Sequence, residues 1–112
     1  MLTVNALRDF GANTREGLGR CLNNETFYLR LVNMALNDAG FGRLAAAVES
    51  GDRKEAFEAA HSLKGVLGNL SLTPLYELTS EMTELLRAGQ DADYSAYLAK
   101  LFALRDELLA MR

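Results

Sequence analysis

The chain has 112 residues, of which 49% are hydrophobic and 24% charged, with a formal net charge of −3. This composition fits one soluble globular domain with a single core, and the acidic balance argues against nonspecific nucleic-acid binding. No apolar run approaches the roughly 20 residues that span a membrane, no signal-peptide pattern is present, and the single cysteine, Cys21, cannot form an internal disulfide, so we expect a cytoplasmic protein without membrane insertion.

Helix-forming residues dominate the whole chain, and no stretch shows the alternation of a strand. Glycines, the single proline and capping residues divide it into predicted helices. In chain order these lie near 2–9 and 14–22, from the cap Asn24 to about 38, at 41–50, at 53–70 after the cap Asp52, from Thr73 and Pro74 to the stop at Gly89, and from Asp91 or Asp93 onward. Gly40 and Gly42 predict a break or kink before the 41–50 helix.

The longer segments carry apolar stripes with the period of a helix. Outside the 53–70 segment these are Phe27, Leu31, Met34 and Ala35; Leu44, Ala47 and Val48; Leu75, Leu78, Met82, Leu85 and Leu86; and Tyr94, Tyr97, Leu98, Leu101, Leu104 and Leu108. Amphipathic helices with short connections favour an antiparallel bundle. The predicted fold is one all-α domain: an up-and-down four-helix bundle over 24–112, with the short N-terminal helices of 1–22 across one end or side.

The 53–70 segment holds the only histidine and has two distinct faces. Its apolar residues share one predicted core face: Ala56, Ala59, Ala60, Leu63, Val66, Leu67 and Leu70. The opposite face carries His61, Lys64, Gly65 and Gly68, at positions i, i+3, i+4 and i+7. We therefore expect His61 and Lys64 to point away from the core.

The two glycines on this outward face are costly for a helix. Each lowers helix stability by up to ~1 kcal/mol relative to alanine, in a domain whose whole stability is about 5–15 kcal/mol. Close helix–helix packing is the common use of paired glycines, but here it would bury His61 and Lys64 as well. We interpret Gly65 and Gly68 instead as clearance for a docking protein.

The residue types on this face suit phosphoryl transfer. Imidazole in general has a pKa near 6.5, so most imidazole at pH 7 is neutral and can act as a nucleophile. The ammonium of Lys64 can pair with a phosphoryl oxygen. The chain has neither a Walker-type loop nor a kinase-type glycine loop. It should therefore have no ATP-binding or kinase activity of its own, and the phosphoryl group must arrive on another protein.

The stretch AHSLKGVLGNL, with the pattern His-x-x-Lys-Gly and a small residue three further on, resembles the histidine-containing phosphotransfer (HPt) domain family. The segments 13–32, GDRKEAFEAAHSLKG and LTPLYELTSEMTELLRAGQ are similar to the family's flanking regions. Ser71 stands ten residues after the histidine, where the family often has glycine, and Leu67 stands where a small residue is common. The resemblance implies a four-helix bundle that shuttles phosphoryl groups in two-component signal transduction.

The resemblance also implies roles and partners. His61 would be phosphorylated by the aspartyl phosphate of one receiver domain and would pass the group to another, while Lys64 steadies the phosphoryl charge. The partners would be response-regulator receiver domains and a hybrid sensor histidine kinase. Magnesium would belong to the receiver, so no cofactor is expected on this chain. We expect a monomeric phosphoryl carrier rather than a stand-alone enzyme.

Two neighbours of His61 have less defined roles. Phe57 falls beside His61 and Gly68 on the outward face, where it can contact a docking receiver or fold sideways against the neighbouring helix. Glu58 can hydrogen-bond the imidazole or remain solvated, and solvation is commoner for a surface helix residue.

Other functions stay open beside phosphotransfer. Glu58 and His61 have the Glu-x-x-His form of di-iron bundles, but such sites need a second copy and further inward glutamates. Haem is not indicated, because no Cys-x-x-Cys-His motif occurs and Met34 and Met82 are predicted core residues. A bundle that binds receivers without transferring phosphate, or one phosphorylated directly by an ATP-dependent histidine kinase domain, remains an alternative.

Overall fold

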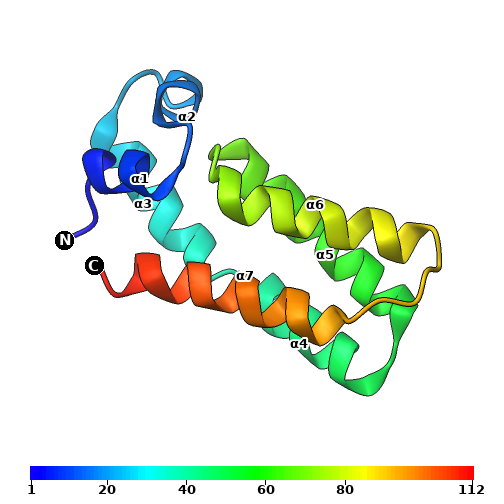
Figure 1. Ribbon diagram of the computed structural model, residues 1–112. Coiled ribbons are helices and arrows are strands. Elements are labelled where there is room, and N and C mark those ends of the chain that lie inside the picture. Colours follow the sequence, from blue (N-terminus) through cyan, green and yellow to red (C-terminus); the bar gives the residue numbers. More distant parts are fainter.

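Seven α-helices and no strand make up the protein, in a computed structural model that describes residues 1–112 (Figure 1). They are α1 (Val4–Phe10), α2 (Thr14–Arg20), α3 (Glu25–Leu36), α4 (Ala39–Ser50), α5 (Arg53–Asn69), α6 (Thr73–Arg87) and α7 (Tyr94–Leu109). Helices α4 to α7 form the antiparallel bundle, α1 and α2 lie at one end of it, and α3 leads into it (Figure 1). The predicted all-α bundle is confirmed. None of the helices has both the length and the apolar character to cross a membrane.

Three helices, α3, α5 and α7, begin directly after the predicted caps Asn24, Asp52 and Asp93. The side chain of Asn24 accepts a hydrogen bond from the Phe27 amide at 3.0 Å, and that of Asp52 accepts one from the Glu55 amide at 3.1 Å. Each satisfies an amide that has no partner within the first helical turn. Gly51 ends α4 in the left-handed conformation, with φ of +76°. These local signals are short-range, which explains why the sequence alone locates them.

The predicted break at Gly40 and Gly42 is wrong. Helix α4 begins at Ala39, and Asp38 caps it by accepting a hydrogen bond from the Gly40 amide at 2.7 Å. A β-carbon at Gly40 would lie 3.3 Å from Cδ1 of Leu63, so glycine here allows α4 to approach α5 closely. The glycines therefore lie inside the helix, and the break between α3 and α4 falls at Asn37 and Asp38.

The turn into α6 also differs from expectation. Thr73 is the first residue of the helix rather than its cap, and Leu72 at the cap position makes no side-chain hydrogen bond. The Thr73 hydroxyl donates to the carbonyl oxygen of Ser71 at 3.3 Å. Pro74 still lies in the first turn, as predicted.

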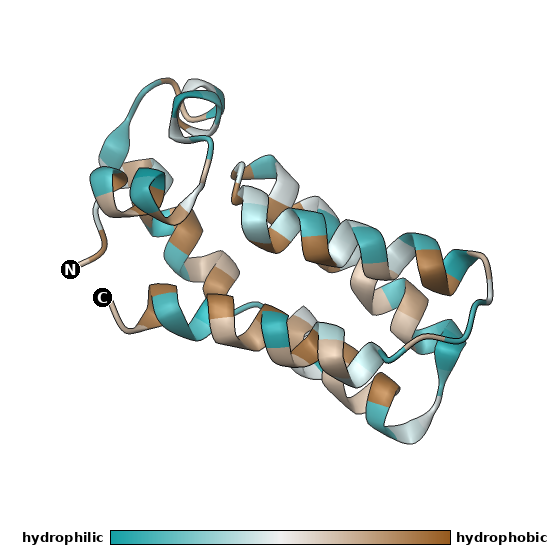
Figure 2. Cartoon of the chain, viewed as in Figure 1, coloured by the Kyte–Doolittle hydropathy of each residue, from teal (hydrophilic) through white to brown (hydrophobic).

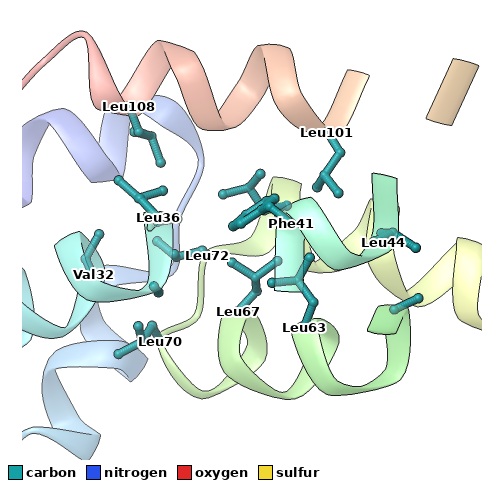
Figure 3. Close-up of a cluster of buried hydrophobic side chains, with 14 of the residues drawn as sticks. Val32, Leu36, Phe41, Leu44, Leu63, Leu67, Leu70, Leu72, Leu101 and Leu108 are labelled. Atoms are coloured by element: carbon teal, nitrogen blue, oxygen red, sulfur yellow. The ribbon is translucent and has the colours of Figure 1, made fainter. Parts of the chain in front are cut away.

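The hydrophobic core is a single cluster of 25 buried residues that extends from Leu2 in the N-terminal segment to Leu108 in α7. Leu63 and Leu67 of α5 point toward Phe41 of α4, beneath α7 (Figure 3). The core face expected for α5 is confirmed, with Val66 only partly buried. The helices of the bundle accordingly carry apolar and polar residues in turn along their length (Figure 2).

Helix α3 is rotated from the predicted orientation: of the predicted stripe, Ala35 is buried and Leu31 is partly buried, but the other two residues are exposed. Phe27 is 43% exposed and Met34 is 63% exposed, so the prediction of Met34 as a core residue is wrong, whereas Met82 is buried. The buried residues are Tyr28, Val32, Ala35 and Leu36. Both sets have helical spacing, so periodicity alone does not distinguish them. The contacts of Tyr28 determine which side of α3 is buried, because its hydroxyl donates to the Leu70 carbonyl at 2.8 Å.

Candidate functional site

The four residues predicted to point outward lie on the side of α5 away from its buried leucines. His61 and Gly65 are exposed, and Lys64 and Gly68 are partly exposed. We call these four residues the His61 face. The helical period places them together, and the burial of Leu63 and Leu67 holds this face toward solvent.

The polar side chains of the His61 face, those of His61 and Lys64, are free of partners within the chain. Neither His61 nor Glu58 takes part in a side-chain hydrogen bond. None of the five ion pairs involves Lys64. Both imidazole nitrogens and the ammonium can therefore engage an incoming group without first breaking an internal contact.

The two glycines of this face differ in their surroundings. A β-carbon at Gly65 would meet nothing within 4 Å, whereas one at Gly68 would lie 2.9 Å from Cδ1 of Tyr76. Gly68 therefore admits the Tyr76 ring of α6, which is itself 37% exposed. The expected bare surface exists at Gly65, but at Gly68 close helix packing fills much of it. Sequence reasoning missed Tyr76, whose only signal was an aromatic residue beside the apolar stripe of its helix.

A shallow hollow of about 550 Å³, lined mostly by polar residues, adjoins the His61 face. It is lined by Asn13, Glu16, Arg20, Lys64, Gly65, Gly68, Asn69, Ser71, Thr73 and Tyr76. Residues from α2, α5 and α6 thus meet at this end of the bundle, and Lys64 and Arg20 bring positive charge to it.

Arg20 fastens α2 to the C-terminal end of α5. Its Nη1 donates to the carbonyl oxygens of Gly68 at 3.1 Å and Asn69 at 3.2 Å, and to Oγ of Ser71 at 2.7 Å. The last carbonyls of a helix have no partner within the helix, so a cationic side chain placed here stabilises that end.

Glu16 completes this contact on the α2 side. Oε1 of Glu16 accepts hydrogen bonds from Oγ of Ser71 and from Nη2 of Arg20, both at 2.8 Å. The hydrogen bond from Ser71 and, secondly, the charge of Arg20 hold the pKa of the Glu16 carboxyl below its usual range. The carboxylate therefore stays charged at neutral pH and keeps Arg20 directed at the end of α5.

Ser71 occupies a backbone conformation that favours glycine. Its φ is +56°, in the left-handed region that glycine adopts without steric cost. The conformation is strained for a non-glycine residue, and the hydrogen bonds of its hydroxyl to Arg20 and Glu16 offset that strain. The residue thus ends α5 as a glycine does, and adds a link to α2.

Phe57 lies one turn before His61 and stacks on it. The two ring centroids are 5.8 Å apart, with 13° between the ring planes. The ring is partly buried against the core, and Cζ of Arg87 lies 5.1 Å from its centroid. Of the two expectations, this geometry favours sideways packing against the neighbouring helix, with the ring also in contact with the histidine.

Glu58 and His61 have no third potential metal ligand grouped with them. No three histidine, cysteine, aspartate or glutamate side chains are grouped where they could hold a metal ion. The di-iron alternative requires such a group, so this side-chain arrangement does not fit it.

The fold and the site together form an antiparallel helical bundle that presents its single histidine beside an unpaired lysine. A comparison with protein-family models matches residues 35–112 to the Hpt domain. The chain therefore belongs to the Hpt domain family, whose members carry out histidine phosphotransfer in phosphorelays with receiver domains and histidine kinases. The match covers α4 to α7, and the resemblance suggested for 13–32 lies outside it. Neither the curated proteins nor the solved structures yield a match.

Proposed function

We propose that His61 accepts a phosphoryl group from the aspartyl phosphate of one receiver domain and passes it to the aspartate of another. The observation that carries the proposal is the exposed, unpartnered imidazole of the only histidine, beside an unpaired Lys64 in the matched family segment. The whole chain, 1–112, acts as one domain in this proposal, since its core extends from Leu2 to Leu108.

The transfer step follows from the free imidazole. A ring nitrogen attacks phosphorus with its lone pair while the bond from phosphorus to the aspartyl oxygen breaks, and the carboxylate leaves with that electron pair. The second ring nitrogen keeps its proton. The ammonium of Lys64 pairs with a phosphoryl oxygen and favours the charged group. Transfer to the second receiver reverses these bond changes, and magnesium acts on the receiver side.

The direct test mixes the protein with a receiver domain that carries ³²P-labelled aspartyl phosphate. We expect acid-labile, base-stable label on this chain, up to one phosphoryl group per molecule, because phosphohistidine has that stability profile and the chain has one histidine. Binding without transfer would instead favour the receiver-binding alternative. Label only from ATP with a histidine kinase domain would favour a kinase as the direct donor.

Gly65→Leu should slow transfer without destabilising the fold. A β-carbon at this position meets nothing within 4 Å, and leucine is a better helix former than glycine by up to ~1 kcal/mol. It occupies the space beside His61 that we assign to the receiver, so a rise of at least about tenfold in the receiver concentration for half-maximal transfer is expected, the effect of an interface residue that contributes about 1.4 kcal/mol.

Gly42→Leu is the matched control for this variant. Gly42 is exposed on α4, and a β-carbon there also meets no atom within 4 Å. We expect normal transfer from it, and normal transfer from Gly65→Leu as well would contradict the docking role. Gly68→Leu is a poorer probe, because it must displace Tyr76.

Lys64→Ala should slow transfer about tenfold or more while the protein stays folded. A hydrogen bond to a charged group contributes about 1.5–3 kcal/mol, and about 1.4 kcal/mol corresponds to tenfold in rate. Single-turnover transfer at saturating receiver measures the effect, and Lys100→Ala on α7 provides an exposed lysine control. An unchanged rate for Lys64→Ala would remove this residue from the mechanism.

A further inference from the structure

We propose that Phe57 is a positioning residue that orients the imidazole of His61, and that Arg87 holds the Phe57 ring in place. This inference rests on the proposed role of His61 as phosphoryl acceptor. It assigns Phe57 to the orientation of the nucleophile rather than to contact with the receiver.

The stacking contact is the orienting interaction that the structure gives His61. Reactive histidines are commonly oriented by a hydrogen bond to one ring nitrogen, but His61 makes none, and Glu58 does not reach it as a partner. The nearly parallel rings, with centroids 5.8 Å apart, restrict the imidazole instead. Both nitrogens thereby remain free, one to attack phosphorus and one to keep its proton.

Phe57 is itself held from two sides. Its ring packs partly against the hydrophobic core. Arg87, in the last turn of α6, places its guanidinium carbon 5.1 Å from the ring centroid, within the range of a cation–π interaction. Nε of Arg87 lies 3.4 Å from Oε2 of Glu84, which steadies the guanidinium. The end of α6 thus supports the histidine of α5 through an intermediate aromatic ring.

Orientation of the imidazole changes the rate by a bounded amount. A helical histidine has two common χ1 wells, and its χ2 is roughly two-fold, which leaves about four orientations. If one of them suits in-line attack, the loss of the stacking partner lowers the transfer rate by at most about fourfold. The affinity for the receiver should not change.

The test compares Phe57→Leu with Phe57→Tyr and with the native chain. Because the chain has one histidine, three-bond couplings and ring-proton shifts in NMR spectra report the His61 rotamers without ambiguity. In Phe57→Leu we expect averaged couplings, loss of the ring-current shift, and a limiting transfer rate about two- to fourfold lower at unchanged half-saturation. Phe57→Tyr keeps the stack and should restore all three readouts.

Two further variants separate positioning from general packing. Phe102 of α7 is also partly buried, with Cζ of Arg105 4.4 Å from its centroid, but it packs edge-on against Phe41. Phe102→Leu should therefore lower stability and leave the His61 couplings and the transfer rate unchanged. Arg87→Gln is a surface change and should shift the His61 couplings in the same direction as Phe57→Leu, by a smaller amount.

Three outcomes would overturn the inference. Native couplings and a native rate in Phe57→Leu would show that Phe57 only packs. A higher half-saturating receiver concentration at an unchanged limiting rate would make Phe57 a docking contact. Native couplings in Arg87→Gln would remove Arg87 from the arrangement. If a chain that lacks His61 still took up label, the proposed function would fail. The NMR couplings of His61 in the native chain and in Phe57→Leu would still test the stacking of Phe57 on His61.

Discussion

His61→Gln is expected to abolish phosphoryl uptake and to leave the bundle folded. The glutamine amide has a size and polarity that suit an exposed helix position but has no nucleophilic lone pair of the imidazole kind. Since His61 is exposed and makes no hydrogen bond, the loss of stability should stay within roughly 1 kcal/mol, mainly from the stack with Phe57. Uptake of label from a phosphorylated receiver, with thermal unfolding of the same sample, measures both effects.

Ser62 supplies the matched control for this prediction. It is the exposed neighbour of His61 and offers a hydroxyl as an alternative acceptor. Ser62→Ala should retain acid-labile label at the native level. If His61→Gln took up as much label as the native chain, the assignment of the acceptor would be wrong.

Gly17→Ala is expected to cause a large loss of stability for a one-carbon change. Gly17 is buried in α2, and a β-carbon there would lie 2.6 Å from Cε1 and 2.7 Å from the hydroxyl oxygen of Tyr28, which is fully buried. Overpacking of this kind costs about 1–3 kcal/mol. Urea unfolding should therefore show a lower midpoint at an unchanged slope.

The hydrogen bond of Tyr28 adds to this cost. Burial and, secondly, the Cys21 thiol raise the pKa of Tyr28 to about 12, so its hydroxyl stays protonated and donates to the Leu70 carbonyl. A shifted ring leaves that buried carbonyl without its donor, which costs a further ~1–3 kcal/mol if no other donor replaces it. Faster amide exchange at the end of α5 would accompany the change.

Gly19→Ala is the control within the same helix. Gly19 is exposed, and a β-carbon there meets nothing within 4 Å. Alanine should then stabilise the helix by up to ~1 kcal/mol. Equal effects of the two substitutions would contradict the contact with Tyr28 as the cause.

The helices and the outward face of α5 could be predicted because their signals are local. Caps at Asn24 and Asp52 act within one turn, and a period of 3.6 residues places His61 opposite Leu63 and Leu67 whatever the rest of the chain does. The family motif around His61 has the same local character. These features survive any arrangement of the other helices that keeps the leucines buried.

Other features depend on contacts between separate helices. Helix α3 has two apolar sides of similar spacing, and burial of Tyr28 between Gly17 and Leu70 selects one of them. Tyr76 reaches Gly68 only because α6 returns antiparallel to α5. No pattern within any one of these segments indicates the contacts, since the partners are distributed over four helices, α2, α3, α5 and α6.

The sequence by itself therefore determined an all-helical chain with one nucleophile turned away from an apolar core, because helical period and capping are properties of neighbouring residues. Only the tertiary structure decided what surrounds that nucleophile. Arg20 at the end of α5, Tyr76 against Gly68, and Arg87 against Phe57 join residues up to 51 positions apart. Such contacts form because packing of the buried faces sets the distance and the angle between two helices. The sequence of a single helix specifies neither the distance nor the angle.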